Sequence, residues 1–237
     1  MPSYYKLVEG TIEIDGVRMH QTARKKPWQD SEDKVKALNP NKNSKTLDIC
    51  TGLGYTAIIE ANKGCHVTTI EKDPNVLNII KENPQSQKLF NNPNIKIVNA
   101  DAFQEIKKMK NDSFDYEMHD PPRFSFAGEL YSQEFYKELF RVLKNKGRLF
   151  HYLGNPKGNT LKKGVKNRLE QAGFTKIKWI EDCKGYLASK NSMEEENELK
   201  AITSYTIKIS GKTKKRTKSG KNNGNTKTLK TQRELKP

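Results

Sequence analysis

The stretch Thr46-Leu-Asp-Ile-Cys-Thr-Gly-Leu-Gly-Tyr-Thr56 decides the fold. It is an apolar run that contains Asp48 and leads into a turn with Gly52 and Gly54, after which we expect a helix to begin. Glycines let the backbone approach a ligand, and a helix N-terminus presents free N–H groups to it. This pattern is typical of the place where a doubly wound sheet holds a nucleotide-like cofactor.

A carboxylate stands where such a cofactor site needs one. An acidic residue is expected about 20 positions after the first strand, at the end of the next strand, where it binds the ribose hydroxyls. Glu71 occupies this place at the end of the predicted strand 67–71. Asp48, the glycine turn and Glu71 together therefore favour a cofactor-binding catalytic domain.

The rest of the chain alternates strands with helices. The predicted strands are 46–50, 67–71, 95–98, 114–119, 148–153, 176–180 and 203–209. The predicted helices are 55–63, 75–82, 160–172 and one that Ser132 caps and Gly147 stops. The last two strands, joined by an acidic stretch, need no crossover helix. This order predicts an α/β fold with a seven-stranded, mainly parallel, doubly wound sheet and one antiparallel strand.

Residues 1–45 are expected to form a small N-terminal module ahead of the cofactor-binding domain. Segments 11–14 and 17–19 alternate in polarity around Asp15 and Gly16, a strong tight-turn pair that predicts a hairpin. A short helix should follow the hairpin. The cofactor-binding domain itself is then expected to span residues 46–210.

The net charge of +16 is unevenly distributed. Residues 211–237 contain ten Lys and Arg residues against one acid, Glu234, and so carry +9. The segment has almost nothing to bury, so we expect it to be disordered. Two interpretations are open: an arm that contacts the phosphates of RNA or DNA, or a solvated appendage.

The composition also limits the protein class. No run approaches the roughly 20 apolar residues that a membrane span needs, and no signal-peptide segment opens the chain, so we expect a cytoplasmic protein without a membrane partner. Cys50, Cys65 and Cys183 lack disulfide-framework or metal-ligand spacing. Neither a disulfide framework nor a metal site is therefore expected.

Residues 46–210 resemble the class I S-adenosylmethionine-dependent methyltransferase domain. Asp48, Gly52 and Gly54 stand in the family's first motif, where Cys50 replaces the first glycine, and Glu71 falls on its ribose-binding acid. The resemblance implies S-adenosyl-L-methionine as cofactor. The binding residues that it implies are Asp48, Thr51, Gly52, Gly54, Tyr55, Thr56, Glu71, Lys72, Asp101, Ala102 and Asp120.

Within that list, Asp101 and Ala102 match the place where a carboxylate and a backbone N–H contact the adenine edge. Asp120 and the two prolines after it fall on the fourth motif, at the substrate end of the fourth strand. In the family this acid orients a target amine. The predicted catalytic residues are therefore Asp120, Pro121, which supplies a backbone carbonyl, and Arg123. The other interpretation of Asp120 is a turn former before proline.

Arg123 stands where amine-methylating relatives carry an aromatic residue. It is expected to contact a phosphate or to stack by its guanidinium plane, and Phe124 or Phe126 then takes the aromatic role. The roles of four neighbouring residues are left open, namely those of His119, Glu129, Tyr131 and His151. Strand-end histidines bonded to the backbone are the leading interpretation of the two histidines.

In more detail, 119–125, 128–132 and 147–152 are similar to a group of archaeal predicted methyltransferases of unassigned substrate. A second resemblance is to polyamine aminopropyltransferases, which use a decarboxylated cofactor. It rests on the N-terminal hairpin and on Leu130-Tyr-Ser-Gln-Glu-Phe-Tyr136. Their glycine turn carries an extra aspartate that 51–55 lacks, so this resemblance ranks second.

A non-catalytic nucleic-acid-binding module is a third possibility. It would not need Asp48, Glu71, Asp101 and Asp120 at cofactor spacing, so the enzyme is favoured. The substrate stays open among RNA, a protein side chain and a small amine. The oligomeric state is open as well.

Overall fold

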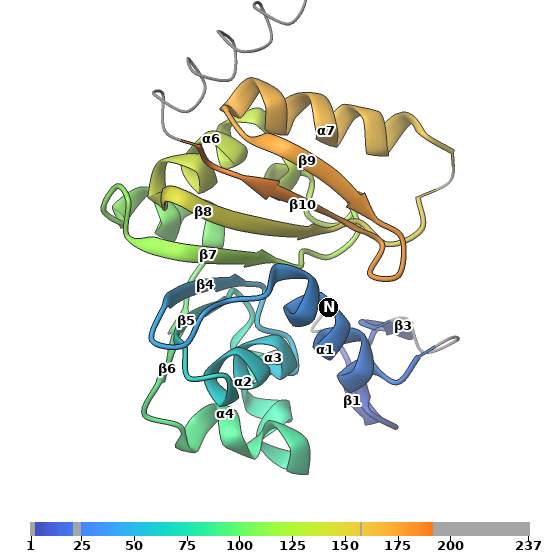
Figure 1. The fold of residues 1–237 in the computed structure, drawn as a ribbon. Helices are drawn as coiled ribbons and strands as arrows, with labels where there is room; N and C mark the ends of the chain where they lie inside the picture. The colour runs from blue at the N-terminus through green and yellow to red at the C-terminus, as the bar shows by residue number, and fades with distance from the viewer. Residues whose placement is uncertain (1–2, 21–24, 157, 192–237) are drawn as a thin grey trace, which may run out of the picture. The chain divides into compact units, whose positions relative to one another are not determined.

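The computed structural model describes residues 3–20, 25–156 and 158–191 (Figure 1). These ranges fall in one contiguous unit, residues 1–192. The predicted strand 203–209 and the basic segment 211–237 lie outside the described residues.

The N-terminal module is a small antiparallel sheet followed by a helix. Its strands pair in the order β1 (Tyr5–Val8), β2 (Thr11–Ile14) and β3 (Val17–Arg18), and helix α1 (Pro27–Leu38) comes next. Asp15 and Gly16 have φ angles of 49° and 79°, the left-handed values that a tight hairpin turn requires. The predicted hairpin is confirmed, and β1 adds a strand that the sequence pattern did not indicate.

The main sheet confirms the predicted fold class. Its seven strands lie in the order β6-β5-β4-β7-β8-β10-β9. Their bounds are β4 (Lys45–Ile49), β5 (His66–Glu71), β6 (Ile95–Asn99), β7 (Phe114–His119), β8 (Leu143–Tyr152), β9 (Thr175–Ile180) and β10 (Gly185–Ser189). Strands β4 to β8 pair in parallel, and β10 runs antiparallel to β8 and β9.

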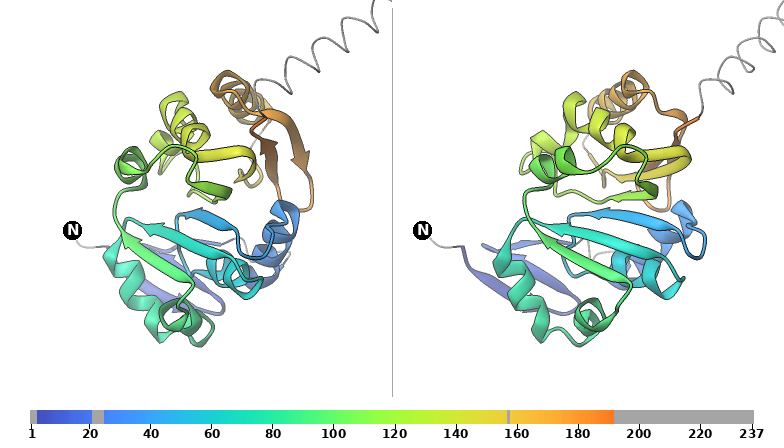
Figure 2. Two further views of the ribbon diagram at one scale, coloured as in Figure 1. Left: turned by 60° about the vertical axis from the view of Figure 1, so that its left-hand side comes forward. Right: turned by 90° about the vertical axis from the view of Figure 1, so that its left-hand side faces the viewer.

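Helices lie on both faces of this sheet (Figure 2). The main ones are α2 (Tyr55–Asn62), α3 (Pro74–Ile79), α4 (Gln87–Asn91), α5 (Ala102–Glu105), α6 (Gln133–Val142) and α7 (Thr160–Ala172). Four short 3-10 segments join them: Ile80–Glu82, Pro84–Ser86, Ile106–Lys108 and Gly128–Tyr131. The predicted cap at Ser132 is confirmed, because Ser132 accepts the N–H of Phe135, and Asp73 caps α3 in the same way by accepting the N–H of Asn75.

The side chains of β8 alternate between the two faces of the main sheet and show what packs on each face. Leu149 packs in the cluster that holds α6 and α7, whereas Phe150 packs against Val35 and Leu38 of α1. Successive side chains of a strand point to opposite faces, so each layer of helices covers one set. The N-terminal helix is therefore part of the domain core and lies against β7 and β8.

The strand that pairs with β9 is β10, at 185–189, and not the predicted 203–209. A four-residue turn joins β9 to β10, so the hairpin closes much earlier than the acidic stretch. At Gly185 an added Cβ would lie 2.6 Å from the His151 carbonyl oxygen and 2.6 Å from the Phe150 ring. Only glycine fits this close approach of two strands.

The helix before β8 ends sooner than predicted. Helix α6 stops at Val142, and Gly147 lies inside β8 instead of ending a helix. A Cβ at Gly147 would lie 2.6 Å from Leu143 Cδ1, so this glycine permits a close packing contact within an irregular strand. The prediction treated Gly147 as a helix stop, which was wrong.

Candidate active site

The loop that follows β4 has the left-handed backbone that its glycines predict. Gly52 and Gly54 have φ angles of 51° and 74°, and Cys50 has 71°. The N–H groups of Cys50 and Thr51 both donate to the Ile70 carbonyl at 3.0 Å, which holds the loop against β5. Cys50 therefore occupies a conformation that suits glycine and costs another residue about 1–2 kcal/mol.

Asp48 lies beneath this loop and is fully buried. Its Oδ1 accepts a hydrogen bond from Thr56 at 2.7 Å, and its Oδ2 accepts one from Thr69 at 2.6 Å. Thr69 is also 2.6 Å from the Thr51 hydroxyl. Burial raises the pKa of Asp48 to about 7, against the opposing effect of the two threonine hydrogen bonds. The arrangement ties the loop to β4, β5 and α2.

Glu71 lies at the carboxyl end of β5 and reaches the loop. Its Oε2 accepts the Gly52 N–H at 3.0 Å, and its Oε1 accepts the Asp73 N–H at 3.0 Å. Burial raises the pKa of Glu71, while these backbone hydrogen bonds act in the opposite direction. A carboxylate has about four acceptor sites, so these bonds orient Glu71 and leave it able to accept from a ligand.

Asp101 and Lys72 meet at the ends of β6 and β5. Lys72 Nζ lies 2.7 Å from Asp101 Oδ2, and Asp101 Oδ1 accepts the Phe103 N–H at 2.9 Å. Lys72 lowers the pKa of Asp101 through this hydrogen bond. Ala102 is the buried first residue of α5. The structure therefore brings these three predicted residues together.

The Tyr55 side chain contacts residues outside the loop after β4. It is buried at the start of α2, edge-on to Trp28 with ring centroids 5.1 Å apart. Its hydroxyl donates to Gln85 Oε1 at 2.9 Å. The tyrosine side chain is therefore occupied with contacts to the N-terminal module and the segment after α3, and a cofactor contact from Tyr55 stays a prediction.

Asp120 is paired with a lysine that the sequence analysis missed. Lys34 Nζ of α1 lies 2.7 Å from Asp120 Oδ2 and 2.8 Å from Asp30 Oδ2. The Lys34 side chain is only 3% exposed and stands 3.8 Å from the centroid of the Tyr152 ring. Lys34 shares the buried face of α1 with Leu38, four residues later. A lysine inside that apolar stripe was the signal for a buried ion pair.

The segment after Asp120 is held by Tyr131. The Tyr131 hydroxyl donates to the Pro122 carbonyl at 2.8 Å, and the Phe126 N–H donates to the Arg123 carbonyl at 2.8 Å. Pro121 is buried and Arg123 is exposed. Phe124 and Phe126 are 50% and 66% exposed, so this loop presents two aromatic rings and one cation to solvent.

His119 and His151 form a buried pair with ring centroids 4.3 Å apart. His119 Nε2 lies 3.0 Å from the Leu130 carbonyl, and His151 Nε2 lies 2.9 Å from the Tyr136 hydroxyl. Burial lowers the pKa of His119 to about 3 and that of His151 well below its usual value. Both rings are therefore neutral, and His119 is bonded to the backbone as the leading interpretation expected.

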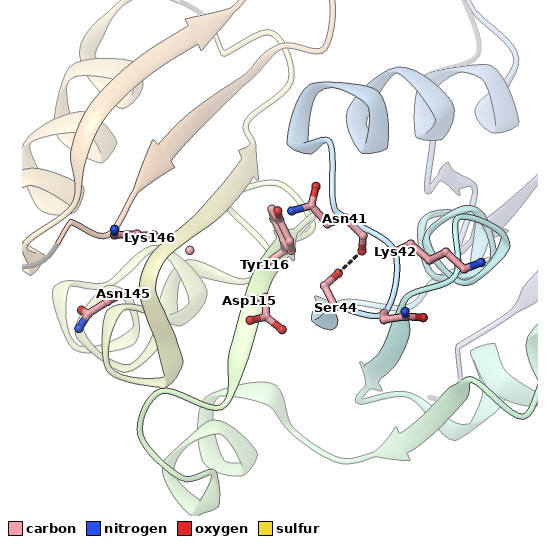
Figure 3. A pocket seen from close by; sticks show the side chains of 9 residues that line it. Asn41, Lys42, Ser44, Asp115, Tyr116, Asn145 and Lys146 are labelled. Carbon is pink, nitrogen blue, oxygen red and sulfur yellow. Dashed lines mark hydrogen bonds between the residues drawn. The ribbon is translucent and has the colours of Figure 1, made fainter.

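Away from this site, a shallow pocket of about 290 Å³ lies at the amino ends of β4 and β7 (Figure 3). Its lining includes Ser44, Asp115 and Tyr116, and none of the predicted site residues. Across the described ranges, no three His, Cys, Asp or Glu side chains are grouped so as to hold a metal ion. Among the helices of the same ranges, none is long and apolar enough to cross a membrane.

Comparison with solved structures defines the class. A spermidine synthase in complex with the transition-state analogue AdoDATO superposes with a TM-score of 0.62 at 19% identity, covering 76% of this chain and 66% of that one. A putative S-adenosyl-L-methionine-dependent methyltransferase from Methanococcus maripaludis gives 0.52 at 16% identity, covering 70% and 87%. The fold is thus the class I fold that methyltransferases and spermidine synthases share.

Sequence comparison places the chain within this class. The family described as "Spermine/spermidine synthase domain" matches residues 57–173. The uncharacterized protein MJ1233 of Methanocaldococcus jannaschii is 52% identical over 194 residues, which are 79% of this chain and 67% of that protein. The chain therefore belongs to the same family as this archaeal protein.

Proposed function

We propose that this chain is an S-adenosylmethionine-dependent methyltransferase whose acceptor binds at Asp120. One observation carries the proposal: Glu71 and Asp120 flank the loop after β4 from the two strands that neighbour β4, and Glu71 accepts the loop's Gly52 N–H. Ligands of open α/β sheets bind at the carboxyl ends of the strands. Glu71 is then the ribose acid, and Asp120 faces the acceptor.

The chemistry asks little of the protein beyond positioning. The bound donor supplies a methyl group already activated on a sulfonium, and in-line displacement leaves S-adenosylhomocysteine. Asp120 accepts a hydrogen bond from the target amine and so aims its lone pair, and the proton of the methylated amine then passes to solvent. Pro121 and its proline neighbour fix the backbone of this turn. Holding both reactants in line contributes several kcal/mol.

An aminopropyltransferase is the second candidate, because the spermine/spermidine synthase family matches residues 57–173. Such an enzyme uses the decarboxylated donor and transfers an aminopropyl group to a polyamine. The fold likeness to spermidine synthase is compatible with both candidates. Tighter binding of the decarboxylated donor by the wild-type protein, with aminopropyl transfer to a polyamine, would favour this second function.

The donor site is tested by replacing Glu71. We expect Glu71→Ala to weaken the binding of S-adenosylmethionine about 10- to 150-fold, because a charge-assisted hydrogen bond contributes about 1.5–3 kcal/mol. Isothermal titration calorimetry measures the change. Glu105→Ala is the matched control, because Glu105 at the end of α5 pairs with Lys108 in the turn that follows. Equal affinity of Glu71→Ala and wild type would remove Glu71 from the site.

RNA as the acceptor is a separate proposal that rests on the charge of residues 211–237. The segment has no aromatic ring on which a base could stack, so we expect its lysines and arginines to act mainly on phosphates. We expect truncation after residue 210 to weaken RNA binding and to flatten its dependence on salt, without changing affinity for S-adenosylmethionine. RNA affinity of both proteins over a salt series measures this. Identical affinities and salt slopes would indicate that the segment is a solvated appendage.

A further inference from the structure

Lys34 is a buried cation beside the carboxylates around the loop after β4. The Asp120 N–H donates to the Ile49 carbonyl at 3.3 Å, so the Lys34–Asp120 pair lies directly beside Cys50. Burial raises the pKa of the Cys50 thiol, and the charges of Glu71 and Asp120 raise it further. The Lys34–Asp120 pair therefore borders the loop from the β7 side, and Glu71 borders it from the β5 side through the Gly52 N–H. In the proposed function the donor binds between them.

Lys34 is held as a charge and not as a spare hydrogen-bond donor. Burial lowers the pKa of Lys34, but the attraction of Asp120 and Asp30 outweighs this effect and leaves the pKa above its ordinary value. Two carboxylates lie within 2.8 Å of Nζ, and the Tyr152 ring lies 3.8 Å from it. These three neighbours occupy the surroundings of the ammonium group. Lys34 therefore acts on a ligand by electrostatic interaction over a distance and not by direct contact.

We infer that Lys34 is a specificity-determining residue, which sets the charge of the donor site so that it favours S-adenosylmethionine over its decarboxylated form. The inference rests on the proposed function. S-adenosylmethionine has a sulfonium, an ammonium and a carboxylate, and its net charge is +1. The decarboxylated donor lacks the carboxylate and carries +2.

The charges of the cluster explain the selection. Asp30, Asp120 and Lys34 together carry −1, and without the lysine they would carry −2. A more negative site favours the doubly charged donor. Two unit charges about 8 Å apart interact by about 2 kcal/mol at the effective dielectric constant of a protein site. The loss of Lys34 should therefore change the ratio of the two donor affinities about tenfold or more.

The experiment compares the affinities for the two donors by calorimetry. Lys34→Met is expected to shift the affinity ratio at least tenfold toward decarboxylated S-adenosylmethionine. Lys34→Arg keeps the charge and should stay within threefold of wild type. Lys36→Met is the matched control, because it removes the same charge from an exposed position of the same helix. Thermal melting checks that each variant is folded.

Two further variants separate charge from structure. Asp30→Asn removes a negative charge and should move the ratio in the opposite direction, toward S-adenosylmethionine, and it serves if Lys34→Met does not fold. The double variant Asp30→Asn with Lys34→Met restores a cluster charge of −1 and should recover the wild-type ratio. An unchanged ratio in folded Lys34→Met, or in Asp30→Asn if Lys34→Met is unfolded, overturns the inference.

The outcomes also distinguish this inference from the proposed function. If wild type prefers the decarboxylated donor and Lys34→Met increases that preference, the methyltransferase proposal fails and the role of Lys34 in setting charge holds. If wild type prefers S-adenosylmethionine and Lys34→Met keeps the same ratio, only the inference fails. If wild type binds neither donor, both are overturned.

Discussion

Replacing Asp120 by alanine is expected to lower methyl transfer about 100- to 10,000-fold, the range over which a positioned acid or base contributes to a reaction. Affinity for S-adenosylmethionine should fall much less, by about the tenfold that one unit charge of the Asp30–Asp120–Lys34 cluster contributes. The reason is position: Asp120 follows β7, whereas Glu71 and Asp101 follow β5 and β6 on the other side of β4. Lys34 keeps Asp30 as a partner in this variant, so the buried cation is not left alone.

The measurement is transfer of labelled methyl from S-adenosylmethionine to RNA, protein and small-molecule fractions of a cell extract. Calorimetry with the same donor gives the affinity. Asp115→Ala is the control, because Asp115 lies at the amino end of β7, the strand that Asp120 follows, and pairs there with Lys144. Full turnover by Asp120→Ala would exclude Asp120 from the mechanism. A loss of donor affinity equal to the loss of transfer would move Asp120 to the donor site.

The parts of the site that the sequence predicted are those encoded by adjacent residues. Asp48, Gly52 and Gly54 lie within one strand and one turn, and positive φ angles at the two glycines follow from local sterics. Glu71 ends β5 and Asp101 follows β6, and parallel strands bring their carboxyl ends to one edge of the sheet. The sheet topology alone therefore predicts that these carboxylates lie at one edge of the sheet.

Lys34 could not be found in that way. It lies 86 residues from Asp120, and it reaches the site only because α1 packs on β7 and β8. The helix was predicted, but the face that it buries depends on tertiary packing. The spacing of Lys34 to Leu38 showed a lysine on the apolar stripe, and a partner for it was visible only in the folded chain.

The region from α6 to β10 was predicted less well for a related reason. The pattern gave a helix that continued to Gly147, whereas α6 ends at Val142 and β8 begins at Leu143. What closes the helix is Lys190, just beyond β10, since its Nζ lies 2.9 Å from the Phe140 carbonyl and 2.6 Å from the Leu143 carbonyl. Because this cap comes from a residue far along the chain, the sequence around the end of α6 does not indicate it.

Lys190→Met is therefore expected to lower the free energy of unfolding by about 2–6 kcal/mol. The methionine keeps the apolar length but leaves the carbonyls of Phe140 and Leu143 without this donor, and each buried unsatisfied group costs about 1–3 kcal/mol. The Asp112 carboxylate, 2.8 Å from Nζ, is 56% exposed and returns to water, so its loss adds little.

Urea denaturation of the wild type and the variant measures the difference. Lys144→Met is the matched control, because Lys144 of β8 also pairs with an aspartate at 2.8 Å but has a side chain that is 41% exposed. A half-exposed pair contributes about 0–1 kcal/mol, so this variant should remain close to wild type. If both variants lost the same small amount, Lys190 would be an ordinary surface pair, and the end of α6 would be fixed by the packing of Leu139 and Val142 alone.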